Sequence, residues 1–173
     1  MKKVVVFSQI DQDVLAQLQQ DYRVVVLNPK LGDINDQIRT EVVDADAMIG
    51  AGRLLNEGNL APAQKLKIIS TVSVGYDNYD LAYLNQKKIW LTNTPHVLTE
   101  TTADLAFTLL MSAARKVPYL DQWTKQGHWQ RTVGEAQFGH DIFGKTLGII
   151  GLGNIGAAVA RRGFYGFNMN ILY

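Results

Sequence analysis

The sequence predicts an α/β protein, with a parallel sheet followed by the first strand, helix and strand of a second sheet. Over residues 1–93, short runs rich in β-branched residues alternate with helical patterns. The pattern changes at Thr94-Pro95, after which a long helical pattern follows. Near residue 150, a β-rich run leads directly into a glycine-rich turn and another helical pattern. Because strands that alternate with helices pair in parallel, both sheets are expected to be parallel.

In the first block, strands are predicted over 4–7, 24–27, 47–51, 66–74 and 90–93, and helices over 11–20, 34–43, 56–64 and 80–88. The first helix carries Val14, Leu15 and Leu18 on one face. Asp80 is expected to cap the last helix of the block, because its carboxylate accepts hydrogen bonds from otherwise unpaired backbone N–H groups.

Beyond Thr94-Pro95, Thr101-x-x-Asp104 is typical of a helix start. Apolar residues then recur at helical spacing, namely Ala103, Ala106, Phe107, Leu110, Ala114 and Val117. They predict one long helix that kinks near Pro118 and continues to about Gln126. A long loop over 127–144, a strand over 145–151, a helix over 154–165 and a strand from about residue 170 complete the series.

Composition excludes several classes of protein. The chain has 17 basic and 16 acidic residues, so it carries no electrostatic footprint for nucleic acid or an anionic membrane. Without cysteine it has neither disulfides nor thiolate metal sites. The apolar run near the N-terminus is too short for a signal peptide, and no stretch approaches a membrane span. These features predict a soluble protein of the cytoplasm.

The strongest motif is Gly151-Leu152-Gly153-Asn154-Ile155-Gly156, which follows a predicted strand and opens a predicted helix. That context is required of a dinucleotide-binding turn. Gly151 would allow the tight turn, Gly153 would let a pyrophosphate approach the backbone, and Gly156 would let helix and strand pack closely. The helix N-terminus would supply N–H groups to the phosphates. The alternative is a glycine-containing turn without a ligand.

A second motif is the strand and turn over residues 70–78, Ser-Thr-Val-Ser-Val-Gly-Tyr-Asp-Asn. Open α/β sheets bind ligands at the carboxyl ends of their strands, where backbone N–H groups are free. The N–H groups of Val74 and Gly75 are therefore candidates for holding a carboxylate. Taken alone, the segment is more often an ordinary turn.

Four segments together resemble the D-2-hydroxyacid dehydrogenases. They are Ser73-Val74-Gly75-Tyr76-Asp77-Asn78, Thr94-Pro95-x-Val97-Leu98-Thr99-Glu100-Thr101, Ala113-Ala114-Arg115 and Gly148-Ile149-Ile150-Gly151-Leu152-Gly153-Asn154-Ile155-Gly156. They occur in the family's order, and the resemblance covers essentially all 173 residues. Within the family, the chain is most similar to the glyoxylate/hydroxypyruvate reductases and the 2-ketogluconate (2-ketoaldonate) reductases.

The resemblance implies a flavodoxin-like substrate (lid) domain over residues 1–98, without a returning C-terminal helix. Residues 99–173 would form a linker helix, a dimer loop and the truncated start of a Rossmann NAD(P)-binding domain. By the same resemblance, Val74 and Gly75 bind the substrate carboxylate, and Arg53 faces the same cleft. A solvated loop arginine is an equally frequent explanation for Arg53.

On the cofactor side, the resemblance places Thr102 near the nicotinamide and Asn154 and Ile155 beside the phosphates. Either NADP or NAD is implied, and the subfamily resemblance favours NADPH. The family's catalytic arginine, glutamate and histidine are expected beyond Tyr173, as is the residue that separates NAD from NADP. The chain itself is therefore expected to be inactive.

The three histidines of the chain are His96, His128 and His140, and none has a carboxylate partner at a recognisable spacing. Each is interpreted as solvated or structural, because a catalytic imidazole needs a partner that fixes its tautomer. The loop containing Trp129 and Phe138 resembles the family's dimer-forming region, which predicts a homodimer. Some relatives place an aromatic there to reach the neighbour's active site. This chain has Gln137 at the nearest position, so interface packing is the other explanation.

Two hypotheses follow for function. In the first, the chain is part of a reductase that transfers hydride from NAD(P)H to a 2-oxo acid such as glyoxylate, hydroxypyruvate or 2-ketogluconate. In the second, it belongs to a non-catalytic nucleotide-sensing or assembly protein with the same fold. Neither hypothesis requires a metal, a nucleic acid or a membrane as partner.

Overall fold

The computed structural model describes residues 1–173, which form two compact units, Met1–Pro95 and His96–Tyr173. The first unit contains β1 (Lys3–Val6), α1 (Gln12–Asp21), β2 (Arg23–Val26), α2 (Ile34–Glu41), β3 (Ala47–Gly50), α3 (Glu57–Leu60), β4 (Ile68–Thr71), α4 (Leu81–Lys87) and β5 (Trp90–Thr92). The second contains α5 (Thr99–Ala114), α6 (Val117–Lys125), β6 (Thr146–Gly148), α7 (Asn154–Arg161) and β7 (Asn170–Leu172).

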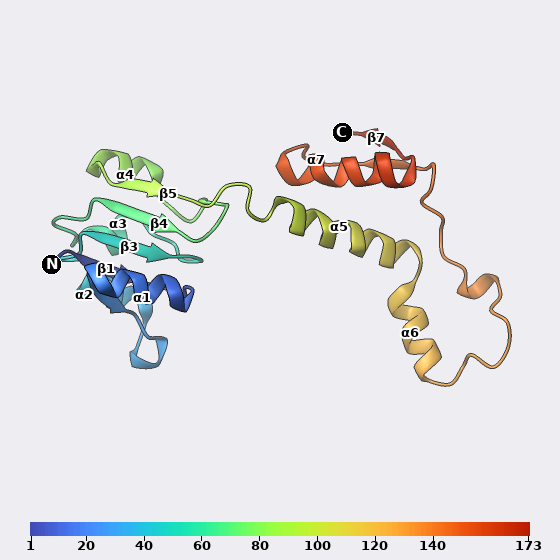
Figure 1. The fold of residues 1–173 in the computed structure, drawn as a ribbon, viewed down its shortest axis with the longest axis horizontal. Coiled ribbons are helices and arrows are strands. Elements are labelled where there is room, and N and C mark those ends of the chain that lie inside the picture. Colours follow the sequence, from blue (N-terminus) through green and yellow to red (C-terminus); the bar gives the residue numbers. More distant parts are fainter. The chain divides into compact units, whose positions relative to one another are not determined.

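The first unit is a five-stranded, fully parallel sheet in the order β2-β1-β3-β4-β5 (Figure 1). This order is that of flavodoxin-like proteins, and it confirms the predicted fold class. Parallel pairing puts the carboxyl ends of all five strands at one edge of the sheet. The loops that follow β3 and β4 therefore leave from neighbouring strands, with Gly50 paired to Thr71 in the ladder.

The core of this unit lies between one face of the sheet and the helices α2, α3 and α4. Among its fully buried side chains are Phe7, Ile38, Met48, Leu60 and Ile69. Large apolar side chains contributed by both sheet and helices fix the strand register, because a one-residue slip would turn each strand's core residues toward the other face.

An Asp or Asn side chain caps the amino end of each helix in this unit. Asp11, Asp33, Asn56 and Asp80 accept hydrogen bonds from the first backbone N–H groups of α1, α2, α3 and α4. These caps satisfy donors that a helix leaves unpaired. The expected role of Asp80 is observed, since its Oδ1 accepts from the Tyr83 N–H at 3.0 Å.

One expectation for the first unit is wrong in detail. The strand predicted over 66–74 is limited to Ile68–Thr71, because the chain bends at residues 72–74 and leaves the ladder. The first helix is found as α1, but it contains no buried residue, and Val14 is exposed while Leu15 and Leu18 are partly buried. Few other residues of the structure therefore pack on this helix. The spacing of its apolar residues alone could not predict how much of the helix is buried.

In the second unit, the single kinked helix predicted from Thr101 is wrong. Helix α5 begins two residues earlier, at Thr99, without a side-chain cap, and it ends at Ala114. Lys116 then adopts a left-handed conformation with φ 56°, which breaks the helix before Pro118. Pro118 occupies the first turn of α6, where its missing N–H costs nothing. Of the six apolar residues expected along one face of this helix, Ala106 and Val117 are exposed.

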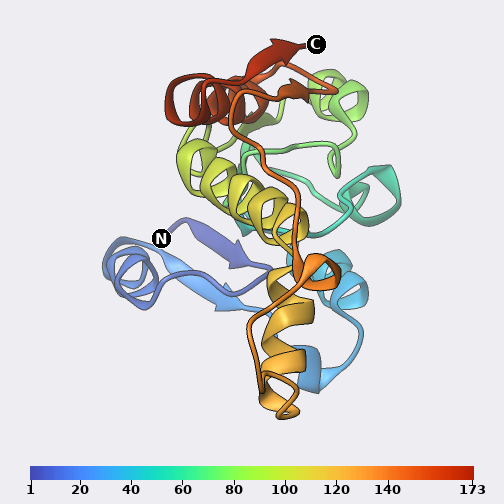
Figure 2. The ribbon, with the colours of Figure 1, turned by 90° about the vertical axis from the view of Figure 1, so that its right-hand side faces the viewer.

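The segment from Gly127 to Gly144 is a loop, as predicted, with one 3₁₀ turn at Glu135–Gln137. It runs back past the junction between α5 and α6 (Figure 2). Two hydrogen bonds hold it there: the His140 N–H donates to Ala114 O at 2.7 Å, and Lys116 Nζ donates to Ala136 O at 3.2 Å.

The second sheet consists of β6 and β7, which pair in parallel and are connected by α7. The helix predicted over 154–165 is α-helical only to Arg161 and continues as a π-helical turn over Arg162–Gly166. This strand–helix–strand unit is the predicted beginning of a doubly wound sheet. No helix of the structure has both the length and the apolar character needed to cross a membrane. No group of three or more acidic or imidazole side chains is arranged to hold a metal ion.

Candidate functional site

The turn after β4 has an unusual arrangement of backbone groups. The Ser73 carbonyl accepts a hydrogen bond from the Thr94 N–H at 3.0 Å, and the Val74 carbonyl accepts one from Asn93 Nδ2 at 2.9 Å. The N–H groups of Val74 and Gly75 donate to no other group of the chain. Val74 is half-buried and Gly75 is exposed, so both donors are available to a ligand.

The loop that carries Arg53 is joined to the same turn by backbone hydrogen bonds. The Leu55 N–H donates to Asn78 O at 2.8 Å, and the Asp80 N–H donates to Leu55 O at 3.0 Å. Leu55 and Tyr79 form an isolated parallel bridge. The structure therefore brings the Arg53 loop and the Val74–Gly75 turn side by side at the carboxyl edge of the sheet.

The side chain of Arg53 is half-buried and makes no hydrogen bond or ion pair. It lines a cavity of about 420 Å³ at the carboxyl ends of β1 and β2 that also contains Phe7, Ser8 and Pro29. Neither Val74 nor Gly75 lines this cavity. Arg53 and the Val74–Gly75 turn are thus on neighbouring loops, but the Arg53 side chain lines a separate cavity.

Two residues with buried hydroxyl groups flank this turn in the sequence. Thr71 and Tyr79 are 2% and 5% exposed, and neither hydroxyl has a hydrogen-bond partner. Burial raises the pKa of the Tyr79 phenol above its usual value. An acidic side chain also lies close by, since a Cβ on Gly75 would stand 3.5 Å from Asp77 Oδ2.

The glycine-rich turn of the second unit has three glycines in three different situations. Gly151 has φ 92°, a left-handed conformation that favours glycine. A Cβ on Gly153 would meet no atom within 4 Å. A Cβ on Gly156 would lie 2.2 Å from Gly151 O, so only glycine fits where the helix packs on the turn.

Helix α7 begins directly after Gly153 and has no side-chain cap. Its first internal hydrogen bond runs from the Ala157 N–H to Gly153 O at 2.8 Å, which leaves the N–H groups of Asn154, Ile155 and Gly156 without a partner. This differs from the four capped helices of the first unit. Open space at Gly153 beside unpaired N–H groups fits a dinucleotide pyrophosphate, which brings its own acceptors to a helix N-terminus.

Asn154 also lines a cavity of about 280 Å³ between the first turn of α5 and one side of α7, together with His96, Thr99, Glu100 and Arg161. Thr102 is exposed on α5 and lies outside this cavity. The three histidines are all exposed, and no ion pair joins any of them to a carboxylate. The structure gives none of them the partner that a general acid requires.

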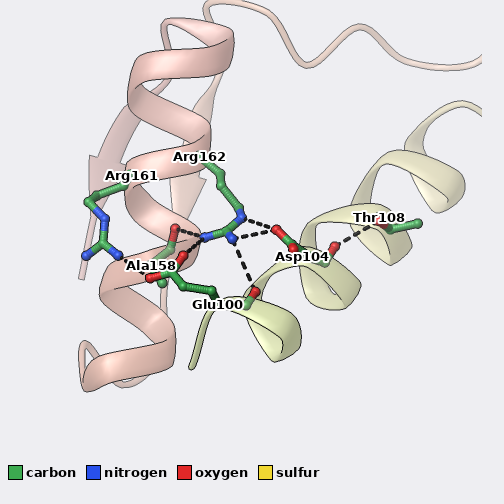
Figure 3. A network of polar contacts seen from close by, with 6 residues as sticks. All are labelled: Glu100, Asp104, Thr108, Ala158, Arg161 and Arg162. Atoms are coloured by element: carbon green, nitrogen blue, oxygen red, sulfur yellow. Dashed lines mark hydrogen bonds and ion pairs between the residues drawn. The ribbon is translucent and has the colours of Figure 1, made fainter. Parts of the chain in front are cut away.

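Two features of the site were missed by reading the sequence. One is the pair Asn93 and Thr94, which holds the turn after β4. The other is the cluster of Glu100, Asp104, Arg161 and Arg162, which joins α5 to α7 (Figure 3). The signal for this cluster was an acidic pair at i, i+4 on one helix and an adjacent basic pair on another, but spacing alone cannot pair two helices.

The model of the family "D-isomer specific 2-hydroxyacid dehydrogenase, catalytic domain" matches residues 4–167. Glyoxylate/hydroxypyruvate reductase B of Serratia proteamaculans is 39% identical over 170 residues, and that of Citrobacter koseri is 38% identical. Each alignment covers 98% of this chain and 52% of the relative. The chain therefore spans about half the length of the curated relatives it matches.

Among solved structures, the NADPH-dependent glyoxylate/hydroxypyruvate reductase of Sinorhizobium meliloti, in complex with NADP and malonate, has a TM-score of 0.78 and 31% identity. The match covers 99% of this chain and 52% of that one. A Thermus thermophilus protein has a TM-score of 0.82 and 32% identity, with 99% and 55% covered. The matched residues, the five-stranded parallel sheet and the glycine-rich turn agree: this chain belongs to the family of D-isomer specific 2-hydroxyacid dehydrogenases.

Proposed function

We propose that the chain is the N-terminal part of an oxidoreductase that transfers hydride from NAD(P)H to a 2-oxo acid and yields the D-2-hydroxy acid. Glyoxylate, hydroxypyruvate and 2-ketogluconate are the substrates to be tested first. The bound nicotinamide supplies the hydride, while the residues of this chain bind and orient cofactor and substrate.

The observation that carries this proposal is the amino end of α7. Three successive N–H groups without partners follow a glycine whose missing side chain leaves open space. Gly151, Gly153, Asn154, Ile155 and Gly156 are the residues proposed to hold the cofactor phosphates through backbone N–H groups and close approach. Thr102 is proposed to contact the nicotinamide.

The substrate carboxylate is proposed to bind the free N–H groups of Val74 and Gly75. Hydrogen bonds from backbone N–H groups to a charged acceptor are stronger than those between neutral groups. Arg53, on the adjoining loop, is proposed to add a positive charge once its side chain turns from its cavity toward the turn. Its lack of any ion pair leaves it free to do so.

Reduction of a ketone also requires a proton donor at the oxygen, and such a group typically contributes about 10²- to 10⁴-fold. The histidines of this chain are exposed and have no carboxylate partner. We therefore propose that the 173 residues by themselves do not catalyse turnover. Weak nucleotide binding is still expected, because the phosphate-binding turn is present.

The preferred cofactor is proposed to be NADPH, since the similar reductase of Sinorhizobium meliloti is NADPH-dependent and was solved with NADP. We also propose that the protein is a homodimer through α5 and the loop around Trp129. Exposed apolar residues occur on α5, on the following helix α6 and on this loop, namely Leu105, Leu109, Val117, Tyr119, Trp129 and Phe138. Apolar patches of this kind mark protein interfaces.

The test compares this chain with the full product of the reading frame that encodes it. Oxidation of NADPH and NADH is followed by absorbance with each of the three oxo acids, and nucleotide binding is measured by calorimetry. Turnover by the full product, together with binding but no turnover by the chain, supports the proposal. A full product that binds NADPH and reduces none of these acids would instead favour a nucleotide-sensing protein.

A further inference from the structure

We infer that Asn93 is a positioning residue for substrate binding: its side-chain amide fixes the direction of the peptide group whose N–H is the Gly75 donor. The inference rests on the proposed function, because it concerns how the carboxylate-binding turn is built. It assigns to Asn93 no contact with substrate or cofactor.

The geometry of a trans peptide relates the direction of a carbonyl to that of the next N–H group. The carbonyl of one residue and the N–H of the next belong to the same planar unit and point in opposite directions. The structure contains no cis peptide bond. When the Val74 carbonyl is held by Asn93 Nδ2 at 2.9 Å, the Gly75 N–H must therefore point away from Asn93.

The preceding peptide group, which joins Ser73 and Val74, is also held. The Ser73 carbonyl is held by the Thr94 N–H at 3.0 Å, so the Val74 N–H points away from Thr94. In an extended strand, successive carbonyls point to opposite sides. Here both carbonyls bind the same short segment, Asn93-Thr94, because the chain bends after β4. Both N–H groups consequently turn away from that segment.

The two donors that hold these carbonyls, the Thr94 N–H and Asn93 Nδ2, differ in kind. Thr94 contributes its backbone N–H, which any residue except proline provides. Asn93 contributes a side-chain donor, and asparagine provides that donor without adding charge. An aspartate at the same place would have no proton to donate when ionised, and its charge would oppose both the carbonyl and a bound carboxylate. The side chain at 93 thus decides the orientation of the Gly75 peptide.

The half-buried position of Asn93 supports this role. The residue follows β5, which is paired with β4 from Ile68–Trp90 to Ser70–Thr92. The register of two neighbouring strands therefore brings Asn93 to the turn. No exposed side chain could hold the carbonyl as firmly, because water competes for the same hydrogen bond.

The experiment uses the 173-residue chain labelled with ¹⁵N and titrated with glyoxylate. In the wild-type chain, the backbone amide signals of Val74 and Gly75 are expected to shift and to saturate with one dissociation constant. Asn93→Leu should weaken that binding about tenfold or more and leave the dispersion of the remaining amide signals unchanged. The control is Asn85→Leu, because Asn85 is exposed on α4 and its side chain makes no hydrogen bond.

Asn93→Asp supplies a second test of the donor. It should bind glyoxylate weakly at neutral pH and regain affinity, relative to Asn93→Leu, as the pH falls toward about 4, where an aspartyl group takes up the proton it can donate. A role in packing alone would not produce this recovery. If Asn93→Leu does not fold, the affinity of Asn93→Asp is compared with that of the wild type at the two pH values, and a recovery at the lower pH still decides the matter.

The outcomes separate the two proposals. If the wild-type signals of Val74 and Gly75 do not move at all, the carboxylate site itself is refuted. If they move and Asn93→Leu binds glyoxylate as tightly as the wild type, the site stands and the role of Asn93 is overturned. Weak binding by Asn93→Leu with normal binding by Asn85→Leu supports both.

Discussion

Arg162 donates two hydrogen bonds to a single carboxylate oxygen of Asp104, from Nε at 2.8 Å and from Nη2 at 2.5 Å. The same guanidinium donates to Ala158 O at 3.0 Å and to Glu100 O at 3.1 Å, and it pairs with the Glu100 carboxylate at 2.9 Å (Figure 3). The hydrogen bond with Asp104 raises the pKa of Arg162 above its usual value. This one side chain joins the first turns of α5 to the last turn of α7.

Arg162→Lys is therefore expected to loosen the contact between α5 and α7. A lysine ammonium is a point charge and cannot reproduce the planar fork of donors. Amide hydrogen exchange in both helices should accelerate about tenfold or more. The matched control is Arg161→Lys, because Arg161 is exposed and contacts Glu100 alone. Equal exchange in the two variants would contradict the assigned role of Arg162.

Substitutions at two glycines of the phosphate-binding turn should affect different properties, cofactor affinity in one case and stability in the other. Gly153→Ala is expected to leave stability unchanged, since its Cβ meets no atom, but to lower NADPH affinity about tenfold by blocking the backbone. Gly156→Ala should cost about 1–3 kcal/mol of unfolding free energy, because its Cβ would overlap Gly151 O. Thermal denaturation and calorimetric titration measure the two effects. NADPH binding unaffected by Gly153→Ala would remove the proposed role of that residue.

The ion pairs of Lys3, at the amino end of β1, should make the stability of the fold depend on pH. Lys3 is buried and pairs with Asp44 at 2.5 Å and with Glu41 at 2.7 Å. The Lys3 hydrogen bond lowers the pKa of Asp44. Because the folded pKa is depressed, this stabilisation is present above the unfolded value of about 3.9 and is lost as the pH falls through the folded pKa.

Lys3→Met should therefore reduce the drop in Tm between neutral pH and about pH 3. Lys2→Met serves as control, since Lys2 is exposed and forms no ion pair. The measurement is thermal denaturation followed by circular dichroism at each pH. An identical pH dependence in Lys3→Met and the wild type would show that the pair between Lys3 and Asp44 contributes nothing to acid unfolding, since Arg23 still pairs with Asp44 in the variant.

The proposed dimer can be tested on α5. Leu105 and Leu109 are each 59% exposed, and they are one helical turn apart. Replacing both with glutamate should convert a dimer to a monomer, because burying two charges in an apolar interface is unfavourable. Light scattering at micromolar concentration gives the mass. Leu31→Glu, which changes an exposed leucine of the first unit, should leave the dimer intact. A wild-type chain and a full product that are both monomeric would exclude the interface.

Several features of this protein were determined by the sequence itself. The strand and helix patterns predicted an α/β fold with parallel sheets, because side-chain periodicity reports local structure directly. The cap at Asp80 and the turn over Gly151–Gly156 followed from residue types with narrow conformational uses. The resemblance to the D-2-hydroxyacid dehydrogenases added the candidate site residues.

Other features were decided only by tertiary structure. The strand after Leu66 ends at Thr71, and the helix after Thr94 breaks at Lys116, because tertiary hydrogen bonds such as those to Ser73 and Ala114 favour other conformations. The placement of Asn93 against Val74 depends on which strands pair and in which register. Periodicity along one segment carries no information about its neighbours. Contacts between segments distant in the chain are fixed when the sheet and helices pack, and those contacts orient the N–H groups of the candidate site.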